Sequence, residues 1–413
     1  MKYGLIGEKL SHSFSKEIHE ALGGYEYEIV EIAKDELDPF MKKRDFTAIN
    51  VTIPYKEAVI PYLDFVSDKA REIGAVNTIL NKEGRLYGYN TDFSGMADLI
   101  NSAGIVIKDK KVLITGTGGT SKTALSVVRA LGASEIYVVS RTKEKGDVTY
   151  DEAYELHSDA NVIINTTPVG MYPHAEGLPI DPKSFKGLEG AVDAIYNPLR
   201  TRFVQGAEKA GAVSAGGLYM LVAQGVRASE LFLDREYPVE TTERLFKKIL
   251  KDKENIVLCG MPGCGKSTIG RVLAERLGRP FFDLDDEIVK AQGRPITDIF
   301  AEGGESLFRD VESDVLRNAL AHRSGAVIAT GGGAILREEN VRLLKQNGRL
   351  YFLDRPIEQL MPTPDRPLAS SAEAIMNRYK ERFPIYCSVC DVHLKTDGVA
   401  EHAAEAIERE FRQ

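Results

Sequence analysis

Two glycine-rich loops of different types, each directly after an apolar run, constrain this chain more than any other feature. The first loop, GTGGTS at residues 116–121, follows the apolar residues 112–114. The second, GMPGCGKS at residues 260–267, follows the apolar residues 256–259. A glycine loop between a strand and a helix presents backbone N–H groups and a helix N-terminus to a phosphate group. We therefore expect two nucleotide-binding folds, one for redox chemistry and one for phosphoryl transfer.

The first loop has the strand–turn–helix context of a dinucleotide-binding unit. Three of its glycines are expected to approach the pyrophosphate: Gly116, Gly118 and Gly119. The following β-like run, residues 136–139, ends in the basic segment SRTKEK at residues 140–145. NAD enzymes commonly have Asp or Glu there, whereas basic groups suit the 2′-phosphate of NADP. We therefore expect NADP(H), with three residues of this segment as ligands: Arg141, Thr142 and Lys145.

The second loop is a complete G-x-x-x-x-G-K-S motif, which predicts ATP and Mg²⁺ as cofactors. Its expected ATP ligands are Gly260, Gly263, Gly265, Lys266, Ser267 and Thr268. Lys266 would reach the terminal phosphates, and the Ser267 hydroxyl would bind the metal. Asp283 and Asp285 follow an apolar pair and lie two residues apart, which would place both carboxylates on one face of a strand. The alternative for these aspartates is a helix cap, a position that also favours Asp.

Short β-like runs alternate with helical patterns along the chain, which predicts an α/β fold with mainly parallel sheets. Residues 1–250 are expected to form one unit, with a substrate-binding part at 1–100 and a Rossmann-type NADP-binding part at 101–235. The C-terminal helices of this unit would return to the substrate part. Residues 236–254 read as a helical linker, since they are charged and not rich in Gly or Ser. Residues 255–413 are expected to form a P-loop kinase domain with a parallel sheet.

Charge and composition limit the partners. A formal net charge of −8 argues against nucleic acid, and no apolar stretch approaches the roughly 20 residues that span a bilayer. We expect a cytoplasmic protein that acts on small molecules, with its number of subunits open. The four cysteines are expected to be free buried thiols. The alternatives for the C-x-x-C pair Cys387 and Cys390 are a redox pair or half of a zinc site.

Polar groups gather at several points of the first 100 residues. The segments are SHSFS at residues 11–15, NVTIPYK at 50–56, GAVNT at 74–78 and GYNTD at 88–92. Hydroxyl, amide and carboxylate groups around one lysine suit a polyhydroxylated acid, with the lysine available for proton transfer.

These segments, together with NTTPVGM at residues 165–171, DAIYNP at 193–198 and GLYMLVAQ at 217–224, make the first 250 residues resemble the shikimate dehydrogenase family. The resemblance implies reduction of 3-dehydroshikimate to shikimate with NADPH, with Lys56 and Asp92 as the catalytic pair. It also implies a set of substrate-binding residues: Ser13, Ser15, Thr52, Asn77, Tyr196 and Gln224. Gly217 is assigned to the cofactor. The chain departs from the usual family residues at four positions outside the catalytic pair: Lys9, Lys16, Glu20 and Thr123.

Residues from about 254 onward resemble the shikimate kinase family. The resemblance runs through the lysine loop, DLD at 283–285, FR at 308–309, Glu312, GGG at 331–333, RPL at 366–368 and RFPIY at 382–386. It implies that Lys266 is catalytic, that Asp283 supports the metal and that Asp285 orients the attacking hydroxyl. The implied shikimate-binding residues are Asp285, Arg309, Gly332, Gly333 and Arg382, and Arg366 is the lid arginine over ATP. A second lid arginine often found before Arg366 is missing here.

The product of the first reaction is the substrate of the second. The sequence therefore predicts a bifunctional enzyme of chorismate biosynthesis that converts 3-dehydroshikimate to shikimate and then to shikimate 3-phosphate. One alternative is a catalytically dead regulator that senses metabolites with the same two folds, which the presence of all the reactive groups disfavours. Another is a first unit that prefers quinate.

Overall fold

The computed structural model describes residues 1–10, 13–360 and 372–413 and divides into two compact units, Met1–Ile249 and Leu250–Gln413. Both units are α/β with mainly parallel sheets, which confirms the predicted fold class. The boundary between them falls inside one helix, α9 (Thr241–Lys253). Within the described residues, no helix combines the length and the apolar character needed to cross a membrane.

The first unit begins with a mixed sheet in the order β2-β1-β3-β5-β6-β4. Its strands are β1 (Tyr3–Gly7), β2 (Glu28–Glu31), β3 (Ala48–Val51), β4 (Phe65–Val66), β5 (Thr78–Lys82) and β6 (Arg85–Tyr89). The strands β1, β2 and β3 are parallel, whereas β5 is antiparallel to both β3 and β6. Ile6, Ile49 and Ile79 are buried in the core of this sheet, as expected for the apolar runs that form it.

The second sheet of this unit is parallel throughout, in the order β12-β11-β10-β7-β8-β9. Its strands are β7 (Lys111–Thr115), β8 (Glu135–Ser140), β9 (Val148–Thr149), β10 (Val162–Asn165), β11 (Gly190–Asp193) and β12 (Val213–Ala215). Strands β7 and β10 are apolar because both of their faces are buried. The strand order reverses between these two, and ligands of such folds bind at the carboxyl ends of the strands at that point.

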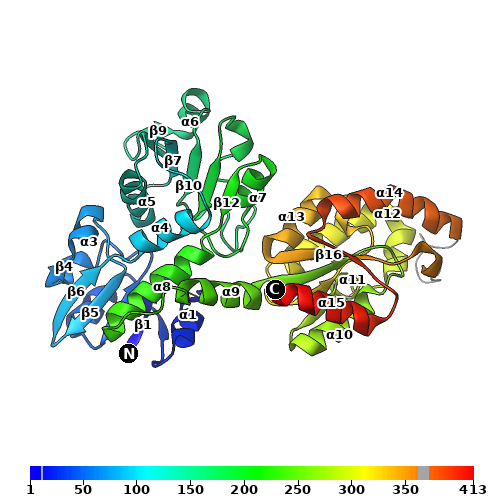
Figure 1. Ribbon diagram of the computed structural model, residues 1–413, viewed down its shortest axis with the longest axis horizontal. Coiled ribbons are helices and arrows are strands. Elements are labelled where there is room, and N and C mark those ends of the chain that lie inside the picture. The colour runs from blue at the N-terminus through cyan, green and yellow to red at the C-terminus, as the bar shows by residue number, and fades with distance from the viewer. Residues whose placement is uncertain (11–12, 361–371) are drawn as a thin grey trace. The chain divides into compact units, whose positions relative to one another are not determined.

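Helices pack around and between the two sheets of the first unit. They are α1 (Ser15–Leu22), α2 (Leu37–Lys43), α3 (Asp68–Ile73), α4 (Asp92–Ser102), α5 (Gly119–Ala130), α6 (Tyr150–Leu156), α7 (Arg202–Lys209) and α8 (Leu218–Leu233). Two of these helices, α4 and α8, join the sheets. Figure 1 shows α4 and α8 between the blue first sheet and the teal second sheet. Met96 of α4 and Met220 of α8 belong to the core under β7 and β10. Farther along α8, Phe232 packs on the first sheet with Leu5 and Tyr27.

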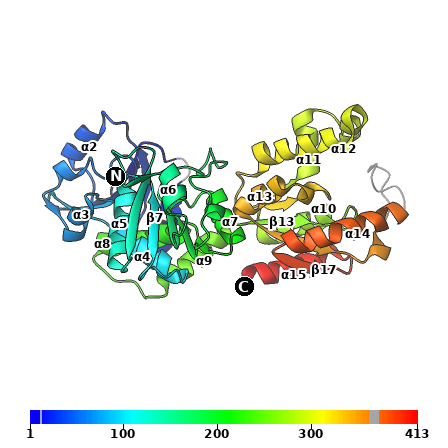
Figure 2. The same cartoon turned by 90° about the horizontal axis from the view of Figure 1, so that it is seen from above.

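The second unit has one parallel sheet in the order β14-β15-β13-β16-β17. Its strands are β13 (Asn255–Cys259), β14 (Phe281–Asp283), β15 (Val327–Ala329), β16 (Gly348–Asp354) and β17 (Val392–Lys395). Its helices are α10 (Lys266–Leu277), α11 (Leu284–Gln292), α12 (Ile296–Val315), α13 (Glu338–Asn347), α14 (Ala372–Val389) and α15 (Ala400–Arg412). Figure 2 shows α11 and α12, in yellow, on one side of this sheet.

The helix α9 is anchored at both of its ends. In the first unit, Phe246 packs against Tyr219 with ring centroids 5.1 Å apart. In the second unit, the carbonyl oxygen of Lys251 accepts a hydrogen bond from Arg279, and that of Lys253 accepts one from the backbone N–H of Gly325. Each part of α9 therefore contacts the unit to which it belongs.

All four cysteines are free. Cys259 and Cys264 are buried in the core of the second unit, but Cys387 is exposed and Cys390 is half-buried. The expectation of four buried thiols is therefore wrong for Cys387, because the last turn of α14 leaves that side chain facing solvent. Among the described residues, no three His, Cys, Asp or Glu side chains are grouped to hold a metal ion.

Candidate active sites

A lysine and an aspartate form a close ion pair in the first unit. Lys56 lies in the turn after β3, and Asp92 is the first residue of α4. Lys56 Nζ donates to Asp92 Oδ2 over 2.6 Å, and the two side chains are only 13% and 8% exposed. Thr52, at the start of the same turn, is held by a backbone hydrogen bond to Ile6. The pair combines a proton donor with a fixed carboxylate in a largely dry environment.

Two of the predicted substrate-binding amides meet beside this pair through Thr91. Asn77 accepts a hydrogen bond from the backbone N–H of Thr91 (2.8 Å) and donates to its hydroxyl (3.0 Å). The Thr91 hydroxyl also lies 3.4 Å from Gln224 Oε1. Thr91 therefore orients both amides, and because it precedes Asp92 it connects them to the ion pair. The sequence analysis did not assign a role to Thr91, although Thr91 lies in the GYNTD segment at residues 88–92.

The buried side-chain amide of Asn50 holds the backbone of Asn77 in place. Asn50 Nδ2 donates to the Asn77 carbonyl oxygen (3.2 Å) and to the Thr78 hydroxyl (3.1 Å). Asn50 Oδ1 accepts from the Tyr27 hydroxyl over 2.7 Å. The amide of Asn50 is thus used in holding strands β3 and β5 in register, as the buried position requires.

The remaining predicted substrate-binding residues come together from opposite ends of the unit's sequence. Ser13 Oγ lies 3.1 Å from Ser15 Oγ at the start of α1. Phe14, between them, packs on Tyr196 with ring centroids 5.2 Å apart. Burial raises the pKa of Tyr196, and a hydrogen bond with Ser13 acts in the opposite direction. The segment after β11 therefore contacts the serine segment.

The first glycine loop forms an open cradle next to the lysine. Gly116 has φ 105°, and a Cβ there would lie 2.8 Å from Thr166 Oγ1, so only glycine fits. Gly118 is the N-cap of α5, and a Cβ on it would meet no atom within 4 Å. A Cβ on Gly119 would lie 3.7 Å from Lys56 Cβ. The donor-rich N-terminus of α5 is therefore open to a phosphate group and adjacent to the ion pair.

A fully buried carboxylate ties three strand ends together under this cradle. Asp193 accepts hydrogen bonds from Thr201 Oγ1 (2.6 Å), the Ile195 backbone N–H (3.0 Å) and Asn165 Nδ2 (3.0 Å). Asn165 also accepts from Thr115 over 2.8 Å. Burial raises the pKa of Asp193 to about 7, although the three donors lower it. Sequence reasoning noted the motifs around Asp193 and Asn165 but assigned them no role.

The predicted 2′-phosphate ligands lie in the turn after β8. Arg141, Thr142 and Lys145 are exposed, and neither cation has an ion-pair partner among the residues that the structure describes. The turn therefore offers two uncommitted positive charges. Gly217 stays a predicted cofactor contact, and packing also requires glycine there, because a Cβ on it would overlap the Ala194 carbonyl oxygen.

The second glycine loop has the backbone conformation of a phosphate cradle. Gly260, Gly263 and Gly265 have φ values of 148°, 81° and 96°, which favour glycine. Gly265 is the N-cap of α10. Lys266 Nζ is buried and donates to the carbonyl oxygens of Gly260 and Met261, both at 3.0 Å. Phosphate oxygens are stronger acceptors than these carbonyls, so the loop fits a nucleotide phosphate.

The predicted metal ligands are in contact. Ser267 Oγ donates to Asp283 Oδ2 over 2.5 Å, and Asp283 Oδ1 accepts from the Asp285 backbone N–H over 3.0 Å. Asp283 ends β14 and caps α11, whereas Asp285 already lies in α11. The prediction of two carboxylates on one face of a strand is therefore wrong, and the helix-cap alternative is confirmed for Asp283, which also contacts the loop serine. A hydroxyl and a carboxylate suit Mg²⁺, which takes its other ligands from phosphate and water. Thr268 is exposed in α10, and Arg366 lies outside the described residues.

Two buried arginines mark the predicted acceptor site. Arg309 of α12 forms ion pairs with Glu312 (2.6 Å) and Glu305 (3.0 Å), and Arg382 of α14 donates to the Gly332 carbonyl oxygen (3.0 Å). Burial alone would lower the pKa of Arg309, but the two glutamates raise it on balance. Burial lowers the pKa of Arg382. Sequence reasoning missed Glu305.

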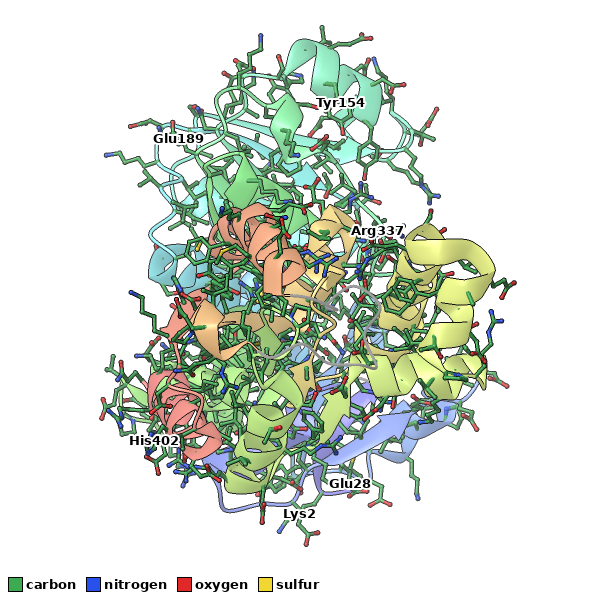
Figure 3. All side chains as sticks on the ribbon, turned by 90° about the vertical axis from the view of Figure 1, so that its right-hand side faces the viewer. Lys2, Glu28, Tyr154, Glu189, Arg337 and His402 are labelled. Atoms are coloured by element: carbon green, nitrogen blue, oxygen red, sulfur yellow. The ribbon has the colours of Figure 1, made fainter. Side chains whose placement is uncertain are left out.

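The glycine segment at residues 331–333 allows the side chains of Glu312 and Arg309 to lie close to Asp285. A Cβ on Gly331 would lie 2.6 Å from Glu312 Oε1 and 3.2 Å from Asp285 Oδ1, and one on Gly333 would overlap the Arg309 guanidinium. Arg337, labelled in Figure 3, donates to the Arg309 carbonyl oxygen over 2.9 Å and so fixes this turn of α12. The glycines therefore allow a close approach that any side chain would block.

Comparison with known families points in the same direction for both units. A model of the shikimate dehydrogenase substrate-binding domain matches residues 5–79. A shikimate kinase model matches residues 262–411.

Individual relatives match the first unit. The chain is 39% identical to the shikimate dehydrogenase (NADP(+)) of Clostridium beijerinckii over 264 residues, which is 59% of this chain and 96% of the relative. The crystal structure of shikimate dehydrogenase 1 from Peptoclostridium difficile is 37% identical, with a TM-score of 0.57, and covers 60% of this chain and 98% of its own. The Thermus thermophilus enzyme in complex with NADP(H) and shikimate is 31% identical, with a TM-score of 0.54 over 60% of this chain and 99% of its own.

Proposed function

Because the chain belongs to the shikimate dehydrogenase family and also carries a shikimate kinase domain, we propose that it catalyses two consecutive reactions of the shikimate pathway. The first is NADPH-dependent reduction of 3-dehydroshikimate to shikimate. The second is ATP-dependent phosphorylation of shikimate to shikimate 3-phosphate. The observation that carries the proposal is the Lys56–Asp92 ion pair beside the open cradle of the first glycine loop, in a chain whose other unit has a lysine loop and an arginine-lined acceptor site.

In the first reaction, Lys56 is the proton donor. Bound NADPH supplies a hydride to the ketone carbon. Negative charge then develops on the ketone oxygen, and Lys56 Nζ donates its proton there, so that a hydroxyl group is formed. Asp92 accepts a hydrogen bond from Lys56 and holds the ammonium group in one orientation. Asn77 and Gln224, both oriented by Thr91, would bind the ring hydroxyls.

In the second reaction, Asp285 orients the attacking hydroxyl of shikimate. Bound ATP and Mg²⁺ supply the phosphoryl group and neutralise its charge. Lys266 would exchange its two carbonyl acceptors for phosphate oxygens, and Ser267 with Asp283 would supply oxygen ligands to the metal. Arg309 and Arg382 would bind the carboxylate of shikimate, since guanidinium groups match carboxylates in geometry and charge. Positioning and charge neutralisation account for most of the catalysis in reactions of this class.

A stepwise assay tests the proposal. The purified chain is given 3-dehydroshikimate and NADPH, and NADPH absorbance is followed; ATP and Mg²⁺ are then added, and shikimate and its 3-phosphate are separated by chromatography. We expect NADPH loss in the first stage and the phosphate ester only in the second. A folded chain that binds shikimate but turns over neither substrate would be a regulator. Faster oxidation of quinate than of shikimate would make the first unit a quinate dehydrogenase.

A further inference from the structure

Both arginines of the predicted acceptor site face one glutamate. Glu305 Oε1 lies 3.0 Å from Arg309 Nη2 and 3.3 Å from Arg309 Nε. The same oxygen is 3.9 Å from Arg382 Nη2. A single carboxylate oxygen of the protein therefore occupies the space between the two guanidinium groups that are proposed to bind the carboxylate of shikimate.

The two glutamates on Arg309 differ in how firmly they are held. The Glu312 side chain is fully buried and pairs with Arg309 at 2.6 Å, so its release would leave an uncompensated buried charge. The Glu305 side chain is 43% exposed, and water can solvate it when it leaves the arginines. Glu305 is therefore the partner that a ligand can displace, while Glu312 is a permanent part of the site.

Arg382 retains capacity for another acceptor. Its side chain is only 6% exposed, and its Nε has no hydrogen-bond partner among the residues that the structure describes. A buried unpartnered donor is costly, and a carboxylate bound here would satisfy it. Glu305 therefore satisfies only one of the two guanidinium groups. It accepts a hydrogen bond from Arg309 Nη2 at 3.0 Å but lies 3.9 Å from Arg382 Nη2.

The backbone before Glu305 separates it from the preceding turns. Gly304 interrupts α12 with φ 66° and ψ −160°, a conformation suited to glycine, and nothing lies within 4 Å of a Cβ built on it. Glu305 is therefore the first residue after the break, and its side chain is not packed into a continuous helix on its N-terminal side.

We propose that Glu305 is a resident competitor: its carboxylate occupies the arginine pair when the site is empty, and the carboxylate of the acceptor replaces it on binding. This inference rests on the proposed kinase function of the second unit. If Glu305 acts in this way, it lowers the apparent affinity for shikimate. Only a ligand with a negatively charged group can then displace the Glu305 carboxylate from the two arginines.

The test is Glu305→Gln, which removes the charge and retains the shape of the side chain. Phosphorylation of shikimate is measured without NADP(H), so that only the second unit consumes shikimate. We expect KM for shikimate to fall about 3- to 10-fold, the range for a half-exposed charge-assisted contact, with kcat unchanged. Glu302→Gln on the same helix is the matched control, because Glu302 pairs with Arg294 and not with the site arginines. It should leave both constants unchanged.

An unchanged KM in Glu305→Gln would overturn the inference, and a raised KM would show instead that Glu305 binds the acceptor directly. Hydrogen–deuterium exchange gives a second readout that needs no turnover. Peptides covering residues 296–315 should become protected at lower shikimate concentrations in Glu305→Gln than in the wild type. If neither protein phosphorylated shikimate but the variant was still protected at lower shikimate concentrations than the wild type, the proposed kinase reaction would be wrong and the role of Glu305 would stand. If the variant needed as much shikimate as the wild type or more, the role of Glu305 would be wrong whatever the turnover.

Discussion

Lys56 Nζ and Asp92 Oδ2 lie 2.6 Å apart although 36 residues separate them along the chain. The contact forms because β3 pairs with β5, which returns through β6 to the start of α4. The glycine loop of the other sheet lies next to the lysine, since a Cβ built on Gly119 would be 3.7 Å from Lys56 Cβ. Proton donor and cofactor cradle are thus supplied by different sheets of one unit.

Replacement of Lys56 by alanine should remove the proton donor and lower dehydrogenase turnover by about 100-fold or more, the scale of general acid catalysis. Kinase activity of the same chain should remain near the wild-type value, because Lys56 belongs to the first unit and the kinase residues belong to the second. The mirror change, Lys266→Ala, should silence phosphorylation alone. Loss of both activities in either folded variant would contradict two independent sites. Each reaction is measured separately, by NADPH absorbance and by ADP formation.

Arg141→Gln should reduce kcat/KM for NADPH, because Arg141 is exposed, has no ion-pair partner in the described part of the chain and follows β8, where a 2′-phosphate is expected. We expect a loss of about 1–3 kcal/mol, the range for charge-assisted hydrogen bonds, and little change with NADH. Lys143→Gln is the matched control, since Lys143 in the same turn is already paired with Glu152. Equal losses for the two variants, or a wild type with equal efficiency for both cofactors, would count against a 2′-phosphate site at Arg141.

The buried carboxylate of Asp193 predicts a pH-dependent stability. Its pKa is raised to about 7 in the folded state, so the folded protein binds the proton more tightly than the unfolded chain, whose Asp pKa is about 3.9. The stabilisation is fully present below pH 4 and is lost as pH rises toward 7, by at most about 1.4 kcal/mol per pH unit.

Asp193→Asn isolates this effect. The amide oxygen of the new asparagine can still accept hydrogen bonds from the Ile195 backbone N–H and from Asn165. Its NH₂ group can donate to the Thr201 hydroxyl, which can rotate to accept. We expect the free energy of unfolding of the variant, relative to the wild type, to rise between pH 5 and 8. The variant is compared with the wild type because His19 also makes stability depend on pH. Burial lowers the pKa of His19 to about 3, so His19 changes stability in the opposite direction over the acid range, and this effect is the same in both proteins. A flat difference would mean that Asp193 ionises normally.

Gly333→Ala should damage the acceptor site of the second unit. A methyl group there would overlap the Arg309 guanidinium, and Arg309 is held on the other side by Glu312 and Arg337. We expect kcat/KM for shikimate phosphorylation to fall on the order of 10- to 100-fold, as a misplaced binding group would cause. Dehydrogenase activity of the same chain should not change, because its residues lie in the first unit, and circular dichroism checks that the second unit is folded. Normal phosphorylation by this variant would place the acceptor elsewhere.

Much of the fold and the positions of the two glycine loops could be predicted from the sequence because their signals are local. An apolar run followed by glycines defines a strand, a turn and a helix start within about ten residues, as at Gly116 and Gly260. The α/β fold class followed from the alternation of such runs, and the runs at residues 112–114, 136–139 and 256–259 are present as strands β7, β8 and β13 within a residue. The linker pattern likewise contains its own helix, α9, with an acidic first turn and a basic last turn.

Tertiary structure decided what the local patterns do not contain. Glu305 is an ordinary helix glutamate in sequence and becomes important only because α12 and α14 place Arg309 and Arg382 on either side of it. Asp193 acquires its raised pKa only from complete burial, which depends on the packing of three strand ends. Cys387 is exposed because of the face of α14 on which it falls. Glycine turns, caps and apolar periods depend on near neighbours along the chain, whereas burial and charge pairing depend on residues brought together from far apart, so only the folded chain determines them.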